Sequence, residues 1–223
     1  MEKKYEFTDE IDIVYRRKVR RIRALKNFGD IKAGDLGGFI EHEGNLSHEG
    51  DCWVGDNACV SHSAKVCGNA RVFEKARIAD RAYISDNAHV FGNACVESEA
   101  CILNKAKVYG KAEVFDNAMV CDNAQVFGNA VVCGKSHIYG YAQVYNKARV
   151  HDQAKIYGKA RVYGQAKVYE KARVYNNAEV YENAKVKGRA EVYALGKIYG
   201  DACVCWNACI GGNQSISTGE KTI

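Results

Sequence analysis

Residues 158–163 read Gly-Lys-Ala-Arg-Val-Tyr, and this six-residue pattern decides the fold because it recurs along most of the chain. Every sixth residue from Val54 to Ile216 is valine or isoleucine, at 28 positions in a row with no insertion or deletion. The residue four places after each is alanine at 24 of the 26 such positions between residues 58 and 208. An apolar spacing of six misses the 3.6-residue period of a helix, so the repeat does not predict helices.

Each unit combines a short strand with a corner. Ala160 to Tyr163 alternate small and large inward residues with polar and aromatic outward ones, which is the strand period of two. Gly164 and Gln165 then turn the chain. Of the 27 positions equivalent to Gly164, 20 are Gly, Asp or Asn, residues that favour sharp turns. A chain of such units must coil into a solenoid in which each unit is buried against its neighbours.

Three units make one turn of this solenoid, because residue character repeats every 18 positions. The outward position after the aliphatic residue is aromatic in eight successive turns: Phe73, Phe91, Tyr109, Phe127, Tyr145, Tyr163, Tyr181 and Tyr199. A second series is Tyr139, Tyr157, Tyr175 and Tyr193. We therefore predict an all-β parallel β-helix with a triangular cross-section and about nine coils, roughly 43 Å long.

The repeat resembles a known family. Units such as Gly128-Asn129-Ala130-Val131-Val132 are similar to the hexapeptide repeats of left-handed β-helix acyltransferases. Residues 30–40 and 50–54 also resemble the leading segment of bacterial and phage proteins of that superfamily. The resemblance implies a left-handed coil, whereas general connection rules favour the right hand. It also implies a trimer that binds a coenzyme A or carrier-protein thioester in a groove between subunits, with a histidine as general base.

Three outward histidines on the strands are the candidates for that base: His89, His137 and His151. Neither His137 nor His151 has a carboxylate stacked in its own column, and each of the three also fits an ordinary surface residue. The family resembled here interrupts its coils with a loop that reaches a neighbouring subunit, but no loop breaks the register of this chain between residues 54 and 216. No nucleophile–base pair or metal-ligand spacing is apparent, so no catalytic residue and no metal site are predicted.

The column of eight aromatic residues predicts either a binding surface or a structural ladder. It is flanked by a partly basic column that includes Arg161 and Lys197. Rings beside cations could bind a glycan or a single nucleic-acid strand. Stacked rings would also stabilise the sheet directly, and an exposed aromatic strip would be a contact between copies of the chain.

Residues 1–37 lie outside the repeat and are predicted to form a small β cap. Residues 4–8 and 14–25 are expected as strands joined by the acidic segment 9–12. The second strand holds six basic residues: Arg16, Arg17, Lys18, Arg20, Arg21 and Arg23. These charges either prevent end-to-end pairing of solenoids or form an anion site. His42 and His48 occupy aliphatic positions of the first coil, where contact with the cap backbone would satisfy them.

Composition restricts the remaining possibilities. The formal charge of +5 is spread thinly, which argues against nucleic acid as a partner. No run of 18 apolar residues predicts a membrane span, and the first residues lack the apolar segment of a signal peptide. The ten cysteines form no Cys-X-X-Cys motif and fit free thiols in a reducing cytoplasm, although Cys203, Cys205 and Cys209 cluster near the end.

Three functions are compatible with these features. The leading hypothesis is a non-catalytic scaffold or binding surface formed by a solenoid over residues 38–216, with the cap before it and a polar tail over residues 217–223. The first alternative is an acyltransferase that uses a coenzyme A thioester at a trimer groove. The second is binding of a glycan or single nucleic-acid strand along the aromatic column.

Overall fold

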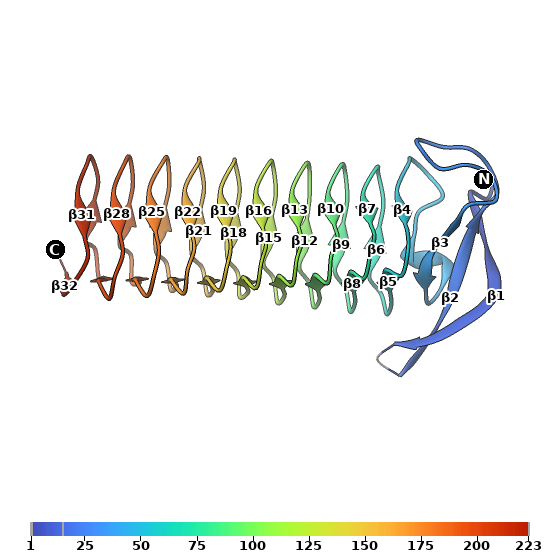
Figure 1. The fold of residues 1–223 in the computed structure, drawn as a ribbon, viewed down its shortest axis with the longest axis horizontal. Helices are drawn as coiled ribbons and strands as arrows, with labels where there is room; N and C mark the ends of the chain where they lie inside the picture. The colour runs from blue at the N-terminus through green and yellow to red at the C-terminus, as the bar shows by residue number, and fades with distance from the viewer. Residues whose placement is uncertain (1, 15, 223) are drawn as a thin grey trace.

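The computed structural model describes residues 2–14 and 16–222 as a straight rod of stacked triangular turns, closed at the N-terminal end by a β hairpin (Figure 1). Its three parallel sheets run the length of the rod and contain 13, 10 and 9 strands. Parallel pairing joins equivalent residues of successive turns throughout the repeat, for example His89 with Lys107 and Val90 with Val108. The predicted fold class is therefore confirmed, with about ten turns rather than nine.

The cap face is the 13-stranded sheet, and it begins with the strands of the N-terminal hairpin. Its strands are β1 (Tyr5–Val14), β2 (Arg17–Ala24), β3 (Leu36–Ile40), β5 (Cys59–Val60), β8 (Arg77–Ile78), β11 (Cys95–Val96), β14 (Glu113–Val114), β17 (Val131–Val132), β20 (Arg149–Val150), β23 (Lys167–Val168), β26 (Lys185–Val186), β29 (Cys203–Val204) and β32 (Glu220–Lys221).

The aromatic face is the ten-stranded sheet, and the remaining sheet of nine strands is the third face. The aromatic face comprises β4 (Trp53–Val54), β7 (Arg71–Val72), β10 (His89–Val90), β13 (Lys107–Val108), β16 (Gln125–Val126), β19 (Gln143–Val144), β22 (Arg161–Val162), β25 (Glu179–Val180), β28 (Lys197–Ile198) and β31 (Ser215–Ile216). The third face comprises β6 (Lys65–Val66), β9 (Tyr83–Ile84), β12 (Cys101–Ile102), β15 (Met119–Val120), β18 (His137–Ile138), β21 (Lys155–Ile156), β24 (Arg173–Val174), β27 (Glu191–Val192) and β30 (Cys209–Ile210).

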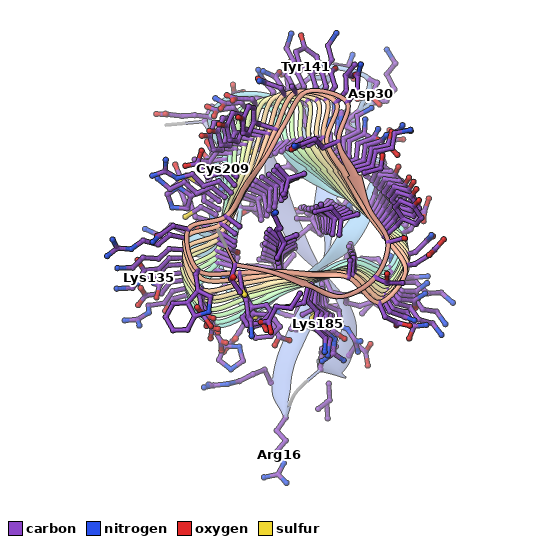
Figure 2. The ribbon with its side chains drawn as sticks, turned by 90° about the vertical axis from the view of Figure 1, so that its left-hand side faces the viewer. Arg16, Asp30, Lys135, Tyr141, Lys185 and Cys209 are labelled. Carbon is purple, nitrogen blue, oxygen red and sulfur yellow. The ribbon has the colours of Figure 1, made fainter. Side chains whose placement is uncertain are left out.

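The coil is left-handed. Figure 2 views the rod from its C-terminal end, with the cap face and Lys185 at the bottom and the third face and Cys209 at the left. The chain leaves the cap face through the corner at Lys135, follows the third face to the corner at Tyr141, and so turns clockwise while it advances toward the viewer. A chain that turns clockwise as it approaches describes a left-handed helix, as the family resemblance implies.

The core consists of columns of valine, isoleucine and alanine along the axis of the rod. These side chains have relative exposures of 0 or 1% from Val54 to Ile210, and Figure 2 shows them stacked inside the triangle. Ser136 replaces an alanine, and its hydroxyl donates to the Cys133 carbonyl at 2.8 Å. Because each methyl group packs against the same group in the next turn, burial is as complete in the middle of the rod as in a larger globular core.

The corners depend on residues that tolerate positive φ. The first corner residue has φ between about +50° and +76° whether it is glycine or not. Where it is aspartate, the carboxylate accepts the backbone N–H of the equivalent residue one turn later, as Asp116 does from Gly134 at 3.0 Å and Asp122 from Gly140 at 3.0 Å. This bond satisfies an N–H outside the strand ladders, which explains why aspartate can replace glycine at a strained position.

The cap differs from its predicted form in the extent of its strands. β1 and β2 pair antiparallel, and the acidic segment 9–12 belongs to β1 instead of connecting two strands. An irregularity between Phe7 and Ile11 interrupts the register of the hairpin. β3 pairs with β2 between Arg20 and Arg23, so it supports the base of the hairpin, and the outer pairs of β1 with residues 17–19 extend beyond β3.

The first coil is held by buried polar contacts with the cap. The Lys4 ammonium is buried and donates to the carbonyls of Gly50 at 3.2 Å and Cys52 at 2.9 Å. His48 accepts the Lys4 N–H at its Nδ1 and stacks on Tyr5 with a centroid distance of 4.4 Å. The expected cap contact is thus confirmed for Nδ1 of His48, whereas its Nε2 is buried without a hydrogen-bond partner among the described residues.

The second histidine of the first coil behaves differently. His42 caps a single turn of 3-10 helix, η1 (Glu43–Asn45), by accepting the Gly44 N–H at 3.1 Å. Its other ring nitrogen lies 2.8 Å from the carbonyl oxygen of His62. These partners belong to the first coils of the solenoid, so the expectation that cap backbone satisfies this histidine is wrong.

The C-terminal tail adds one more strand to the end of the rod. β32 pairs with β29 on the cap face, with Glu220 opposite Cys203. The predicted polar tail therefore covers one of the three open edges at this end. Among residues 2–14 and 16–222 there is no helix long and apolar enough to cross a membrane.

Candidate binding site on the aromatic face

The eight predicted aromatic residues form one continuous ladder, half-buried along the aromatic face. Neighbouring rings from Phe73 to Tyr199 stack with centroid distances of 4.8 to 5.2 Å and interplanar angles of 1 to 6°. The centroid spacing is close to the spacing of neighbouring strands, so the plane of each ring is roughly perpendicular to the axis of the rod. One flat side of a ring therefore faces the turn before it, and the other faces the turn after it.

This geometry determines what the ladder can offer a ligand. Within the ladder, both flat sides of a ring are covered by its neighbours, and only ring edges and hydroxyl groups face outward. Proteins that bind single nucleic-acid strands stack successive bases on uncovered ring faces. The inner rungs of this ladder have no such faces, because every stacking surface is already used between turns.

The polar groups beside the ladder also pair with one another. The Arg161 guanidinium bonds to the Glu179 carboxylate, and the Tyr163 hydroxyl donates to the same carboxylate at 3.0 Å. Burial of the ring, followed by this bond to Glu179, raises the pKa of Tyr163. The Tyr109 hydroxyl donates to Gln125 at 3.2 Å. Of the two flanking cations predicted to bind a ligand, Arg161 is thus occupied, whereas Lys197 lies exposed next to Glu179 in the strand register.

A recess of about 560 Å³ opens where the ladder meets the cap. Its walls come from the loop between β2 and β3 (residues 25–35, the cap loop), the start of β3, the first three turns of the aromatic face and the corner after β4. The lining residues are Asp30, Ile31, Asp35, Leu36, Trp53, Gly55, Asp56, Arg71, Val72, Phe73 and His89. Figure 2 places Asp30 outside the triangle on the side of the aromatic face.

His89 is the one predicted base that lines this recess. Burial, reinforced by Lys107 and Arg71, lowers the pKa of His89, so its imidazole is uncharged at neutral pH. The guanidinium of Arg71 pairs with the Asp30 carboxylate from the cap loop. Sequence analysis did not find Asp30, Asp35 or Asp56 as members of a site. No sequence signal joins them, because only the folding of the cap loop over the first turns brings these positions together.

The other two histidines lie on different faces. His137 is on the third face between Met119 and Lys155, and no residue of the recess is near it in the strand register. His151 is on the cap face, and its Nδ1 lies 3.2 Å from the Asp152 carboxylate. The three predicted bases are therefore not brought together.

Asp152 is the corner residue that follows His151 in the chain, so the column of residues stacked from turn to turn does not contain it. The His151 ring stacks on Tyr169 with a centroid distance of 5.0 Å and an angle of 11°. Cys133 occupies the same column one turn earlier. Burial and the carboxylates of Asp116 and Asp152 raise the pKa of the Cys133 thiol, the opposite of what an activated nucleophile requires.

Three of the six basic residues predicted as an anion site pair with carboxylates. Arg23 pairs with Glu6, Arg17 with Glu41 and Arg20 lies over the Phe7 ring at 3.9 Å. Arg21 bonds to Glu10 and donates to the carbonyls of Gly37 and Asp56 at 2.8 Å. These contacts tie the hairpin to the first turns of the solenoid.

The other interpretation of the basic residues, protection of the sheet edge, does not fit the strand order. β2 lies inside the sheet, and β1, with Asp9, Glu10 and Asp12, is the edge strand. Lys18 is exposed on β2, and Arg16 lies at the tip of the hairpin, outside the triangular outline in Figure 2.

A cluster of thiol and carboxylate side chains lies at the C-terminal end of the rod. The thiols of Cys203 and Cys205 and the carboxylate of Glu220 place their ligand atoms within 4.8 Å of one another. The Cys205 thiol donates to Glu220 at 3.0 Å, and the Lys187 ammonium lies 4.0 Å from the same carboxylate. Cys209 is on the third face and does not join them. Burial, followed by the bond to Glu220, raises the pKa of Cys205 to about 11, which keeps this thiol protonated.

The exposed apolar side chains lie away from the ladder, except for Leu36, which lines the recess beside Phe73. The ladder residues are not among the exposed large apolar residues, so the expected exposed aromatic strip is absent from the described residues. The exposed large apolar side chains lie on the hairpin, the cap, the third face and the corners: Ile11, Ile13, Leu25, Leu36, Tyr83, Tyr141, Leu195 and Trp206.

Protein-family models and curated protein sequences give no match to this chain.

Proposed function

We propose that the protein is a rigid, non-catalytic scaffold that holds its N-terminal cap at a fixed distance from the other end of the rod. The repeat solenoid fold itself fits this role. The observation that carries the proposal is the uninterrupted stacking from Phe73 to Tyr199, in which every turn repeats the pairing of the turn before it.

The stiffness follows from the way the turns are joined. Each turn is bonded to the next on three sides by backbone hydrogen bonds, and the ring ladders add a side-chain contact at every step. Bending the rod would separate strands on one side and break several of these contacts together. The cap is tied to the first turns by Arg21 and the buried Lys4, so it moves with the rod.

Small-angle X-ray scattering tests the scaffold role directly. A variant that lacks residues 128–163 keeps the register, because Phe127 is then followed by Gly164 at the same corner position. The longest dimension should fall by two strand spacings, about 10 Å, with no change in the cross-section. A rigid rod is contradicted if the longest dimension of the full chain varies with ionic strength. It is also contradicted if the longest dimension of the variant without residues 128–163 equals that of the full chain.

An acyltransferase is the second candidate function, and the His151–Asp152 contact favours it. A carboxylate beside an imidazole can orient it as a general base, and the resemblance to trimeric acyltransferases supplies the reaction: acyl transfer from a coenzyme A or carrier-protein thioester to a hydroxyl or amine. In this proposal a second or third copy of the chain would complete the site by covering the cap face near His151.

Thiol release from acetyl-coenzyme A distinguishes the two candidates, with sedimentation giving the number of copies in solution. The scaffold proposal expects no release above the uncatalysed rate with simple amines or amino sugars. Saturable release by a trimer that is lost in His151→Asn, while His137→Asn retains it, establishes the enzyme and overturns the scaffold. Glycan binding would involve ring edges and hydroxyl groups, and Tyr163→Phe with Tyr181→Phe should then abolish retention on a polysaccharide column.

A further inference from the structure

The aromatic ladder ends at the cap with one ring face that no other ring covers. Phe73 stacks on Phe91 at 4.9 Å, and among residues 2–14 and 16–222 no ring stacks on its opposite side. The strand register pairs Val54 with Val72, and the Gly55 N–H donates to the Val72 carbonyl at 2.8 Å. The ladder position before Phe73 is therefore Gly55, which has no side chain.

Gly55 is not required by the backbone at this place. It does not have a positive φ, and it is therefore not a residue that needs glycine for its conformation. A Cβ atom built there would lie 3.6 Å from Trp53 and 3.7 Å from Phe73, which are ordinary contact distances. An aromatic residue would extend the ladder here as it does in the eight following turns. Glycine instead leaves the position over the uncovered side of Phe73 without a side chain, and we call this space the end slot.

The end slot opens into the recess beneath the cap loop. Trp53 and Leu36 supply apolar walls, and the recess of about 560 Å³ exceeds the size of a two- or three-ring heterocycle. A pocket that combines an apolar wall with a few fixed polar groups is the usual form of a small-molecule site. The other end of the ladder differs, because Tyr199 is followed one turn later by Ser217 next to the open end of the rod.

The polar groups that line the recess favour a ligand that donates hydrogen bonds. Three carboxylates line it, and the one cation, Arg71, is already paired with Asp30. Asp35 and Asp56 each accept one backbone N–H through Oδ2, from Lys32 at 2.8 Å and Glu74 at 2.9 Å. These bonds fix the two carboxylates and leave their Oδ1 atoms without a partner in the described part of the chain. The lining thus carries excess negative charge in a fixed arrangement.

We propose that the end slot binds a flat, amino-substituted nitrogen heterocycle, which stacks on Phe73 as an added rung of the ladder. Its N–H groups donate to the fixed carboxylates of Asp35 and Asp56, and its flat ring fills the position that Gly55 leaves empty. An anionic ring of the same shape is rejected by these carboxylates. The proposal does not depend on the scaffold function, since a rigid rod or an enzyme could equally carry such a site.

Titration of the full chain with proflavine, a flat diamino heterocycle whose fluorescence changes on stacking, tests the site. Wild-type protein should bind one equivalent saturably and should not bind anthracene-9-carboxylate, a flat anion. Gly55→Tyr fills the slot and should weaken proflavine binding at least about tenfold, as loss of one stacking contact implies. The matched control is Ser217→Tyr, which extends the ladder at the other end and should bind as wild type does.

Two further variants separate loss of the slot from loss of the fold. Gly55→Ala adds only the Cβ that has room, so it should fold normally and bind with an intermediate affinity. Asp35→Asn keeps an acceptor for the Lys32 N–H but removes the charge, and should weaken proflavine binding about threefold or more. Equal binding by wild type and Gly55→Tyr, an equal loss in Ser217→Tyr, or equal affinity for the anionic ring overturns the proposal.

Discussion

Phe91 and Tyr109 belong to successive turns of the rod, and their rings stack with centroids 4.8 Å apart and planes 1° from parallel. The same relationship recurs along the ladder because the strands beneath the rings are in register, as Val90 with Val108 shows. Side-chain stacking and backbone pairing therefore have the same period, and each reinforces the other. Replacement of one ring should therefore weaken the contacts of its turn with both neighbouring turns.

Removal of one inner ring should destabilise the rod. Phe127→Ala loses two stacked contacts, with Tyr109 and Tyr145, and no hydrogen bond. At 0.2–1 kcal/mol for each of the two cross-strand pairs, the free energy of unfolding should fall by about 0.4–2 kcal/mol, as measured by denaturant titration. Tyr141→Ala is the control, since this ring is 63% exposed at a corner and should change stability by less than about 0.5 kcal/mol. Equal losses in both variants contradict a structural ladder.

The corner aspartates should stabilise the rod through the hydrogen bond that each carboxylate accepts from the next turn, in addition to their preference for turns. Asp116 has φ of 58° and accepts the Gly134 N–H at 3.0 Å. Asp116→Ala loses the bond and keeps the strained conformation, so it should cost about 2 kcal/mol of unfolding free energy. Asp116→Gly loses the bond but relieves the strain and should cost less, while Asp116→Asn should be nearly neutral. A larger loss in the glycine variant than in the alanine variant would show that strain at this corner is unimportant.

The buried ammonium of Lys4 should hold the cap to the first coil. Lys4→Met preserves the length of the side chain but leaves the carbonyls of Gly50 and Cys52 without this donor. The cap should lose about 1–3 kcal/mol of local stability, the cost of unsatisfied buried acceptors. Hydrogen exchange should therefore quicken in β1 and β2 and stay unchanged in the middle of the rod. Lys3→Met, which removes only an exposed pair with Glu43, serves as the control and should leave exchange unaltered.

The attachment of the cap should weaken in mild acid because of His48. Burial, together with the nearby Lys4 ammonium, lowers the pKa of His48 despite an opposing effect of Glu43. The unfolded chain then binds a proton near pH 6.5 while the folded cap does not, so stability falls as pH decreases below that value. His48→Phe keeps a ring against Tyr5 and removes the titrating group. Its stability should depend less on pH between 6.5 and 5 than that of wild type, and an identical pH dependence would exclude His48 as the cause.

The repeat could be predicted in detail because its physical determinants are local and periodic. Columns that stack from turn to turn follow from the count of six-residue units, and the structure places Tyr145, Tyr163 and Tyr181 on one face as predicted. The acidic segment 9–12 was predicted as a connection because acidic residues are poor strand formers, whereas in the structure it continues β1, and Ile11 and Asp12 pair with Arg20 and Val19 of β2.

The candidate site could be predicted only in part. The sequence predicted the ladder, but it did not predict that neighbouring rings cover each other's flat sides, because the positions of aromatic residues do not determine how the rings are oriented. The recess was not found at all. It joins Asp30 and Asp35 to Phe73 and His89 through the fold of a loop that has no periodicity, and such contacts depend on long-range packing.

The sequence by itself determined the triangular turn, the inward columns of valine and alanine, and the alignment of the rings. The six-residue period places the aliphatic side chains inside every turn, and the repetition of the aromatic residues every 18 positions sets three units to a turn. The tertiary structure alone decided that a recess opens beside Phe73 at the end of the ladder, and that three carboxylates line it. These features arise where the non-repeating cap folds onto the repeat, and contacts between segments distant in the chain cannot be read from either segment alone.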